Sequence, residues 1–126
     1  MRVLLSVSVL VIITILLSVH GYNLIRSNTD DLLFDLGDLE IATKKNDWSK
    51  ASSLDKKLNK NWSEANKILP VLIDHAELHD LETFIAKISI LIELHEEERL
   101  LTEISAAKEL LKNIPLQEKL TIRNIL

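Results

Sequence analysis

The distribution of hydrophobic and polar positions divides the chain into an apolar beginning and an amphipathic remainder. Residues 3–19, VLLSVSVLVIITILLSV, contain no charged residue, no Gly and no Pro. As a helix this run is roughly 26 Å long, and extending it to Tyr22 brings it to about 30 Å, the thickness of a bilayer's hydrocarbon core. We therefore predict a membrane anchor at 1–22. Its lipid-facing positions are represented by Val3, Leu10, Leu17 and Val19.

Two other interpretations of the apolar run remain open. A cleaved signal peptide has an apolar region of about 7 to 15 residues and small residues before the cut, and Val19 with Gly21 would form a weak cleavage pair. A buried core helix would require a 126-residue chain to cover a helix that is apolar on every side. The hydroxyl groups in the run favour the anchor, because each can bond to the carbonyl four residues earlier.

The charge next to the anchor predicts its orientation. Arg2 and the amino terminus precede the apolar run, and a short positive amino end usually stays in the cytoplasm. We expect a single-pass plasma-membrane protein whose C-terminal domain lies on the extracytoplasmic side. The chain has no Cys, which excludes a lipid-modified cysteine and fits an extracytoplasmic domain without disulfides.

The first amphipathic stretch predicts a helix beginning near Thr29, after a link at 23–28. Gly37 lies inside this helix, where it costs about 1 kcal/mol relative to Ala. It is either simply tolerated there or marks a close contact with another helix. The predicted apolar face comprises Leu32, Leu36 and Leu39, and is widened by Leu33 and Phe34.

A second helix is predicted after a turn at Asn46, with Asp47 as its N-cap. Its apolar positions recur at steps of three or four. We interpret Trp48 and Trp62 as packing anchors rather than as ligand-stacking residues, because both lie on this stripe. Pro70 either ends the helix or kinks it. The stripe comprises Trp48, Ala51, Leu54, Leu58, Trp62, Ala65 and Leu69.

Two further helices are predicted, separated by a turn at 95–98, HEEE. We expect the last helix to run over 97–113 and to stop at Pro115. The apolar tail at 116–126 would then pack back as a short helix or bind a partner. The apolar positions of the two helices are Ile73, Leu78, Leu81, Phe84, Ile85, Ile88, Leu91, Ile92 and Leu94, and then Leu100, Ile104, Ala107, Leu111 and Ile114.

These elements predict an all-α protein: one N-terminal transmembrane helix followed by an antiparallel bundle of about four helices at 29–126. The formal net charge is −4, and without Arg2 the remainder carries about −5. No basic stripe is present, which argues against nucleic acid and against an anionic lipid surface as partners of the bundle.

One cluster of residues has the composition of a metal site. His75 and His79 in DHAELHD, residues 74–80, are four apart and would share a helix face. A third ligand would have to come from His95 or from an acidic residue on another helix. Solvent-facing histidines are the favoured interpretation. With no Cys and no Gly-rich phosphate loop, we expect no catalytic residue, no cofactor and no enzyme.

Several short motifs, taken in order, resemble a known bacterial family. They are DWSKA at 47–51, Trp62, IDHAE at 73–77 and the segment from Ile114 to Leu126 that contains EKLT and NIL. The family is catalogued as a domain of unknown function, number forty-three sixty-three, and occurs mainly in spore-forming Gram-positive bacteria. The resemblance implies a small, N-terminally membrane-anchored helical protein. It implies no activity, and it draws attention to His75 within IDHAE.

The sequence therefore favours a membrane-anchored extracytoplasmic helical module with a protein-interaction or scaffolding role. Its expected partners are the lipid bilayer, through the N-terminal helix, and an unidentified protein. Two alternatives stay open: a metal- or ligand-sensing bundle that uses His75 and His79, and a secreted helical protein released by signal cleavage.

Overall fold

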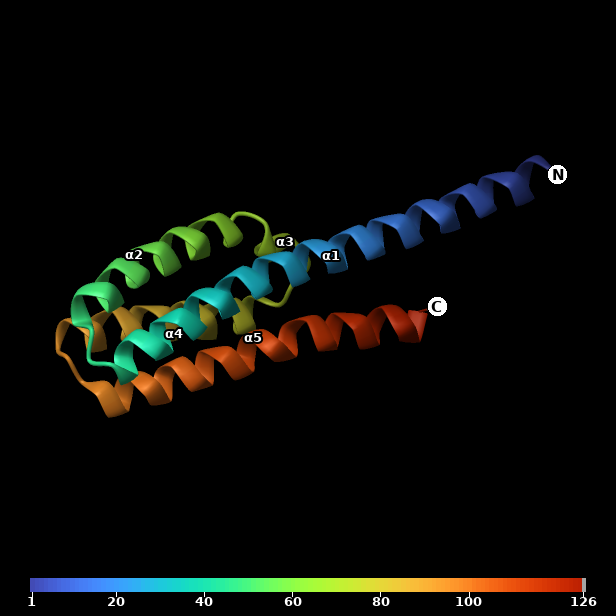
Figure 1. Ribbon diagram of the computed structural model, residues 1–126. Coiled ribbons are helices and arrows are strands. Elements are labelled where there is room, and N and C mark those ends of the chain that lie inside the picture. The colour runs from blue at the N-terminus through green and yellow to red at the C-terminus, as the bar shows by residue number, and fades with distance from the viewer. Residues whose placement is uncertain (126) are drawn as a thin grey trace.

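The computed structural model describes the backbone of residues 1–125 and the side chains of residues 1–116. Within these residues every regular element is a helix, which confirms the all-α prediction. The four long helices are α1 (Arg2–Lys44), α2 (Trp48–Ala65), α4 (His75–Glu93) and α5 (Glu97–Ile125), and a single turn, α3 (Leu69–Leu72), joins α2 to α4. Figure 1 shows the N-terminal end of α1 projecting beyond the other helices, of which α5 reaches furthest in the same direction.

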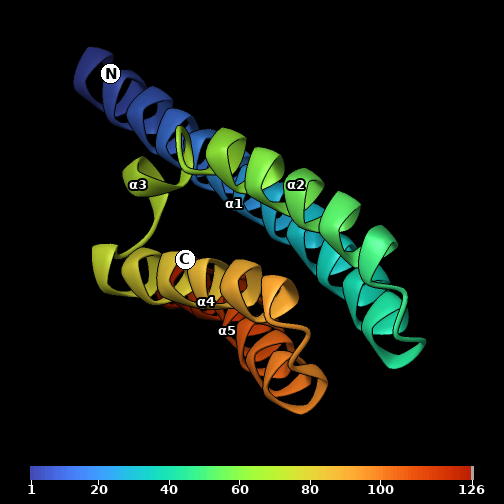
Figure 2. The same ribbon diagram turned by 90° about the vertical axis from the view of Figure 1, so that its left-hand side faces the viewer.

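The four long helices form a bundle in which successive helices run in opposite directions. The second half of α1 contacts α2 and α5, and α4 contacts the same two helices, so α1 and α4 occupy opposite corners. Figure 2 shows α1 beside α2 and α4 beside α5, with α3 crossing from one pair to the other. This is the predicted antiparallel arrangement of about four helices.

The core is built from the predicted apolar stripes. Leu36 and Leu39 of α1, Leu58 of α2 and Leu81 of α4 are among the fully buried side chains. The α5 stripe is buried along its whole predicted length, in Leu100, Ile104, Ala107, Leu111 and Ile114. Burial of a leucine-sized side chain contributes about 1.5 to 3 kcal/mol, so these stripes hold the helices together.

The predicted link at 23–28 is wrong, because α1 is continuous from Arg2 to Lys44. No Pro occurs in α1, and polar side chains in this segment bond to the helix instead of breaking it. Asn28 donates from Nδ2 to the Leu24 carbonyl oxygen at 2.8 Å, and Thr29 donates to the Arg26 carbonyl oxygen at 3.0 Å. The projecting segment and the first helix of the bundle are therefore one rod of 43 residues, about 65 Å long.

Phe34 does not widen the buried face of α1, and that prediction is also wrong. Its side chain is 65 % exposed, whereas Leu32 and Leu36 are buried. Residues two apart on a helix point to different faces, so Phe34 cannot share the stripe of its neighbours at 32 and 36. Gly37 is a tolerated glycine, since a Cβ built there would meet nothing within 4 Å.

The turns predicted at Asn46, near Pro70 and at 95–98 are present. Asn46 adopts a positive φ of 54°, and the Asp47 side chain accepts a hydrogen bond from the Lys50 backbone amide at 3.1 Å. α2 ends at Ala65, and Pro70 then lies in the first turn of α3, so the chain breaks here rather than kinks. His95, also at φ 54°, turns the chain from α4 into α5.

Pro115 does not end the last helix, contrary to expectation, because α5 continues to Ile125. A proline inside a helix removes one backbone hydrogen bond but does not prevent the following residues from staying helical. Leu111 and Ile114 are fully buried just before it and hold the backbone in place. The apolar tail predicted to pack separately is thus part of α5. Among its side chains Leu116 is exposed, and those from 117 onward lie outside the described residues.

Candidate functional site

The projecting half of α1 is the most unusual feature of the molecule. Among residues 1–125, α1 is the one helix long and apolar enough to cross a membrane, and none of its most apolar window is buried inside the protein. Val3, Leu10, Leu17 and Val19 all have exposed side chains. An apolar helix without protein partners is energetically unfavourable in water, because its whole circumference would be hydrated.

The polar groups within this segment are internally satisfied, as predicted. The hydroxyl groups of Ser6, Ser8, Thr14 and Ser18 each donate to the carbonyl oxygen four residues earlier, at 2.8–2.9 Å. Such bonds remove the penalty that a bare hydroxyl would incur in hydrocarbon. The surface of the segment is therefore compatible with lipid over its whole circumference.

The bundle begins where α3 packs against α1. A Cβ built at Gly21 would lie 3.4 Å from Leu72 Cδ2, so the small residue lets α3 approach α1. Tyr22 is half-buried next to it and lines a groove of about 450 Å³ between α1 and α5. Arg26 of α1 and Lys112 of α5 lie on the rim of the same groove. The transition from the projecting segment to the bundle is thus marked by an aromatic residue followed by cations.

A buried carboxylate joins α1 to α2. The Asp35 side chain is 1 % exposed and accepts a hydrogen bond from Asn61 Nδ2. Lys57 Nζ lies 3.4 Å from Asp35 Oδ1 and 5.6 Å above the centre of the Phe34 ring. A buried carboxylate of this kind requires charged and hydrogen-bonding partners, and both come from α2. The cluster fixes the pairing of the two helices, and sequence patterning gave no sign of it.

A second carboxylate lies between α2 and α4. Asp55 accepts a hydrogen bond from the Ser89 hydroxyl at 2.9 Å and from Asn59 Nδ2 at 3.0 Å. Burial raises the pKa of Asp55 above its usual value of 3.8; these two hydrogen bonds oppose the shift, and the charge of Glu93 adds to it. The arrangement links α2 to α4.

A third polar contact joins α1 to α5. Glu40 pairs with Lys108 of α5 and with Lys44 of its own helix, the latter at 3.0 Å. The hydrogen bond from Lys108, and then that from Lys44, lowers the pKa of Glu40 below 4.5. This contact and the two carboxylate clusters lie on helix seams, where they set the register of the bundle.

The two candidate metal ligands do not form a site within the described residues. His75 and His79 are both exposed at the start of α4. His95 cannot join them, because the 19 residues of α4 separate it from His75 by about 28 Å. Among the described side chains no three His, Cys, Asp or Glu residues are close enough to hold a metal ion. The geometry therefore gives no support to the sensing alternative.

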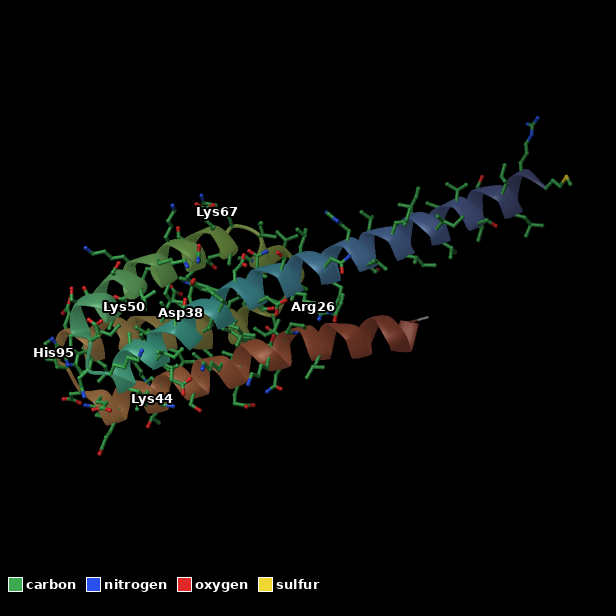
Figure 3. All side chains as sticks on the ribbon, in the orientation of Figure 1. Arg26, Asp38, Lys44, Lys50, Lys67 and His95 are labelled. Carbon is green, nitrogen blue, oxygen red and sulfur yellow. The ribbon has the colours of Figure 1, made fainter. Side chains whose placement is uncertain are left out.

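His95 instead stacks on a tryptophan at the far end of the bundle. The ring centres of Trp48 and His95 are 4.6 Å apart, and the two planes are nearly parallel. This contact joins the α1–α2 turn to the α4–α5 turn. Trp62 is 7 % exposed and lies in the core, whereas Trp48 is only partly buried. Figure 3 shows His95 and Lys44 at this end and Arg26 toward the projecting segment.

These features define a class: an all-α protein in which one long helix runs from an apolar projection into an up-and-down four-helix bundle. The sequence profile of the family described as Domain of unknown function (DUF4363) matches residues 19–125, and the chain belongs to that family. The resemblance drawn from the short motifs is thereby confirmed. The match begins at Val19, so it covers the bundle and leaves most of the projecting segment outside. No curated protein and no solved structure matches the chain.

Proposed function

We propose that the protein is a single-pass membrane protein whose helical bundle serves as an interaction module on the extracytoplasmic face of the plasma membrane. The observation that carries this proposal is the apolar projection at 3–19, none of whose most apolar window is buried within the described part of the chain. Inserting this segment into a bilayer would remove its apolar surface from water. A soluble bundle would gain nothing from keeping it.

The proposed orientation follows from charge. Arg2 precedes the apolar segment, and the acidic bundle follows it. A positively charged amino end is retained in the cytoplasm, so the bundle would be translocated. Tyr22 and Arg26 then lie at the level of the lipid headgroups, where aromatic and cationic side chains are favoured.

The role as an interaction module rests on the outward surface of the bundle. Several large apolar side chains of the bundle are more than half exposed, among them Phe34, Ile41, Ile90 and Leu94. Phe34 and Ile41 lie on α1, and Ile90 and Leu94 lie at the end of α4, so the bundle has two exposed apolar surfaces of the kind that is typical of protein contacts. The rigid connection through residues 20–28 would hold these faces upright at a fixed height above the membrane.

Intact mass spectrometry of a C-terminally tagged chain, recovered separately from membranes and medium, tests the anchor. Full-length protein confined to the membrane supports the proposal. A mass lacking residues 1–21, found in the medium, would replace the anchor with a signal peptide and the tethered module with a secreted bundle.

Cysteine labelling tests the orientation, because the natural chain has no Cys. A single Ser52→Cys change introduces a thiol at an exposed position of α2. A membrane-impermeant maleimide should label it in intact cells as fully as in lysed cells. Labelling only after lysis would place the bundle in the cytoplasm, and the Cys-free parent reports the background.

A further inference from the structure

The outer surface of α1 within the bundle carries an apolar strip between acidic residues. Phe34 and Ile41 are 65 % and 53 % exposed and lie seven residues apart, so they share one side of the helix. Gly37 lies between them with open space in front of it. We name this surface the α1 face, made of Asp30, Phe34, Gly37, Asp38 and Ile41. It is open to a neighbouring molecule, and at its glycine a helix could approach closely.

A complementary surface lies on the side of the bundle formed by α4 and α5. Ile90 and Leu94 of α4 are 56 % and 59 % exposed. They line a shallow groove of about 230 Å³ between α4 and α5. We name it the α4–α5 groove; it is lined by Lys87, Ile90, Leu91, Leu94, Arg99 and Glu103. It is apolar in its centre, and two of the three charged residues at its edge are cations.

The two surfaces face away from each other at the same height. α1 and α4 occupy opposite corners of the bundle, and both run toward the end closed by the Trp48–His95 stack. Asp38 lies six residues before the last residue of α1, and Lys87 lies six residues before the last residue of α4. Ile41 and Ile90 each lie three residues before those ends. Figure 3 shows Asp38 on α1 in the part that lies within the bundle.

At this height Asp38 and Lys87 carry opposite charges. Within the described side chains, neither Asp38 nor Lys87 forms a hydrogen bond or an ion pair. A carboxylate on the α1 face and an ammonium group on the α4–α5 groove would therefore meet if two upright bundles were placed side by side. Such complementarity fixes the register of a contact more than it adds affinity.

We propose that the occupant of the α4–α5 groove is the α1 face of a second copy of this chain. The inference rests on the proposed function, because membrane anchoring holds every copy upright and brings the two surfaces to one level. Ile41 of one copy lies against Ile90 and Leu94 of the next, and Asp38 pairs with Lys87. The contact is small, but confinement to a membrane raises the effective concentration of its partners.

The contact uses different surfaces on the two copies, so it does not close as a two-fold dimer. Each copy still presents one free α1 face and one free α4–α5 groove, and further copies add in the same direction. Because the two surfaces lie on different sides of the bundle, the product is a row, or a ring of many copies, in the plane of the membrane. The bundle is then a row-forming element rather than a receptor for an unrelated protein.

Disulfide cross-linking in membranes tests the proposal with the full-length chain. A double variant, Ile41→Cys with Ile90→Cys, should give a ladder of multimers after mild oxidation. Each single variant should remain monomeric, because equivalent positions do not meet in such a contact. A matched control, Ile41→Cys with Ser52→Cys, keeps an exposed thiol on α1 but moves the second one to α2, and should give no ladder.

The outcomes separate the two proposals. Full-length protein in the membrane without a ladder overturns the assembly and leaves the anchor intact. Dimers from a single-cysteine variant would also overturn it, since they require a two-fold contact. Release of a processed protein into the medium, seen in the intact mass of the same samples, overturns the anchor itself.

Charge reversal gives an independent test. Asp38→Lys or Lys87→Asp, added to the cysteine pair, should lower the multimer fraction about fivefold, as expected for roughly 1 kcal/mol per contact. The two changes together should restore it, because the ion pair is re-formed with reversed sign. Failure of the combined variant to recover would count against the pairing of Asp38 with Lys87.

Gly37→Leu separates assembly from folding. The open space at Gly37 accommodates the new side chain within one copy, so thermal unfolding should be unchanged or slightly improved. The same side chain would obstruct the approach of a neighbouring α4, and the ladder should disappear. A ladder as strong as that of the parent pair would show that the α1 face is not the contact.

Discussion

The two halves of α1 belong to one unbroken helix, yet they place their side chains in opposite surroundings. In the projecting half apolar residues occupy every side, and all of 3–14 are exposed. In the bundle half apolar residues return every three or four positions, and Ile25, Leu32, Leu36 and Leu39 are buried. The backbone is the same in both halves. The surroundings of each half therefore follow from the arrangement of its side chains.

This difference shows that pattern, more than apolar content, decides what covers a helix. A stripe about 100° wide can be covered by two neighbours in a small bundle, and the remaining surface can stay polar. A helix that is apolar all around needs either many neighbours or a bilayer. Within the described residues the bundle offers too few neighbours for that, which is why we propose a bilayer around the projecting half.

The largest expected effect compares one leucine in each half. Leu36→Ala removes a fully buried side chain and should lower the free energy of unfolding by about 2 to 5 kcal/mol. Leu10→Ala removes an exposed side chain outside the bundle and should leave that free energy unchanged. Urea unfolding of the detergent-solubilised chain, followed by fluorescence of Trp48 and Trp62, measures both. Equal losses in the two variants would mean that the halves fold as one packed unit.

A charge in the projecting half should act on membrane retention instead. Leu10→Arg places a cation near the middle of the apolar segment, at a cost of about 3 kcal/mol for insertion. The fraction of full-length protein in the membrane should fall sharply, while the bundle's unfolding midpoint stays constant. Fractionation followed by quantitative blotting measures the first quantity. Unchanged retention would show that 3–19 does not lie in the bilayer.

The fold was largely predictable because helical periodicity is a local signal. The stripe from Ala51 to Leu69 and that from Leu100 to Ile114 identify buried faces without knowledge of their partners. The turn at Asn46 and Asp47 is likewise local, since its positive φ and its cap depend on two adjacent residues. These parts of the structure were predicted correctly for that reason.

The errors arose where tertiary contacts outweigh local preference. A polar segment at 23–28 suggested a link, but Asn28 and Thr29 bond to the helix, and Ile25 is buried against the bundle. Pro115 suggested an end, but the burial of Leu111 and Ile114 holds α5 in place around it. Local propensity is a weak predictor when a helix has such neighbours.

The candidate contact surfaces could be predicted even less. The exposure of Phe34 follows from its spacing to Leu32 and Leu36, but the neighbour of its ring does not: Lys57 of α2 lies 5.6 Å from the ring centre. The level of Asp38 relative to Lys87 depends on the topology of the whole bundle. Neither is contained in a sequence window, so these features emerge only from the packed structure.

The smallest expected effect is the response of the bundle to acid. The projecting half has no titratable side chain from Val3 to Val19, so pH acts on α1 through its bundle half. The pKa of Glu40 is lowered by Lys108 and Lys44. Its contribution to stability is therefore present above pH 4.5 and is lost as the pH falls through the folded-state pKa.

Glu40→Gln should lower the free energy of unfolding at pH 7 by at most about 1 kcal/mol, because the pair is partly exposed. The difference from the parent should shrink toward zero at pH 3.

Asp55→Asn is the matched control, because the pKa of Asp55 is shifted in the opposite direction. The pKa of Asp55 is raised by burial, so its favourable contribution exists below pH 3.8 and is lost as the pH rises. This variant should therefore gain stability relative to the parent between pH 3 and pH 7. The same pH slope in both variants would mean that the two carboxylates do not act through the seams described for them.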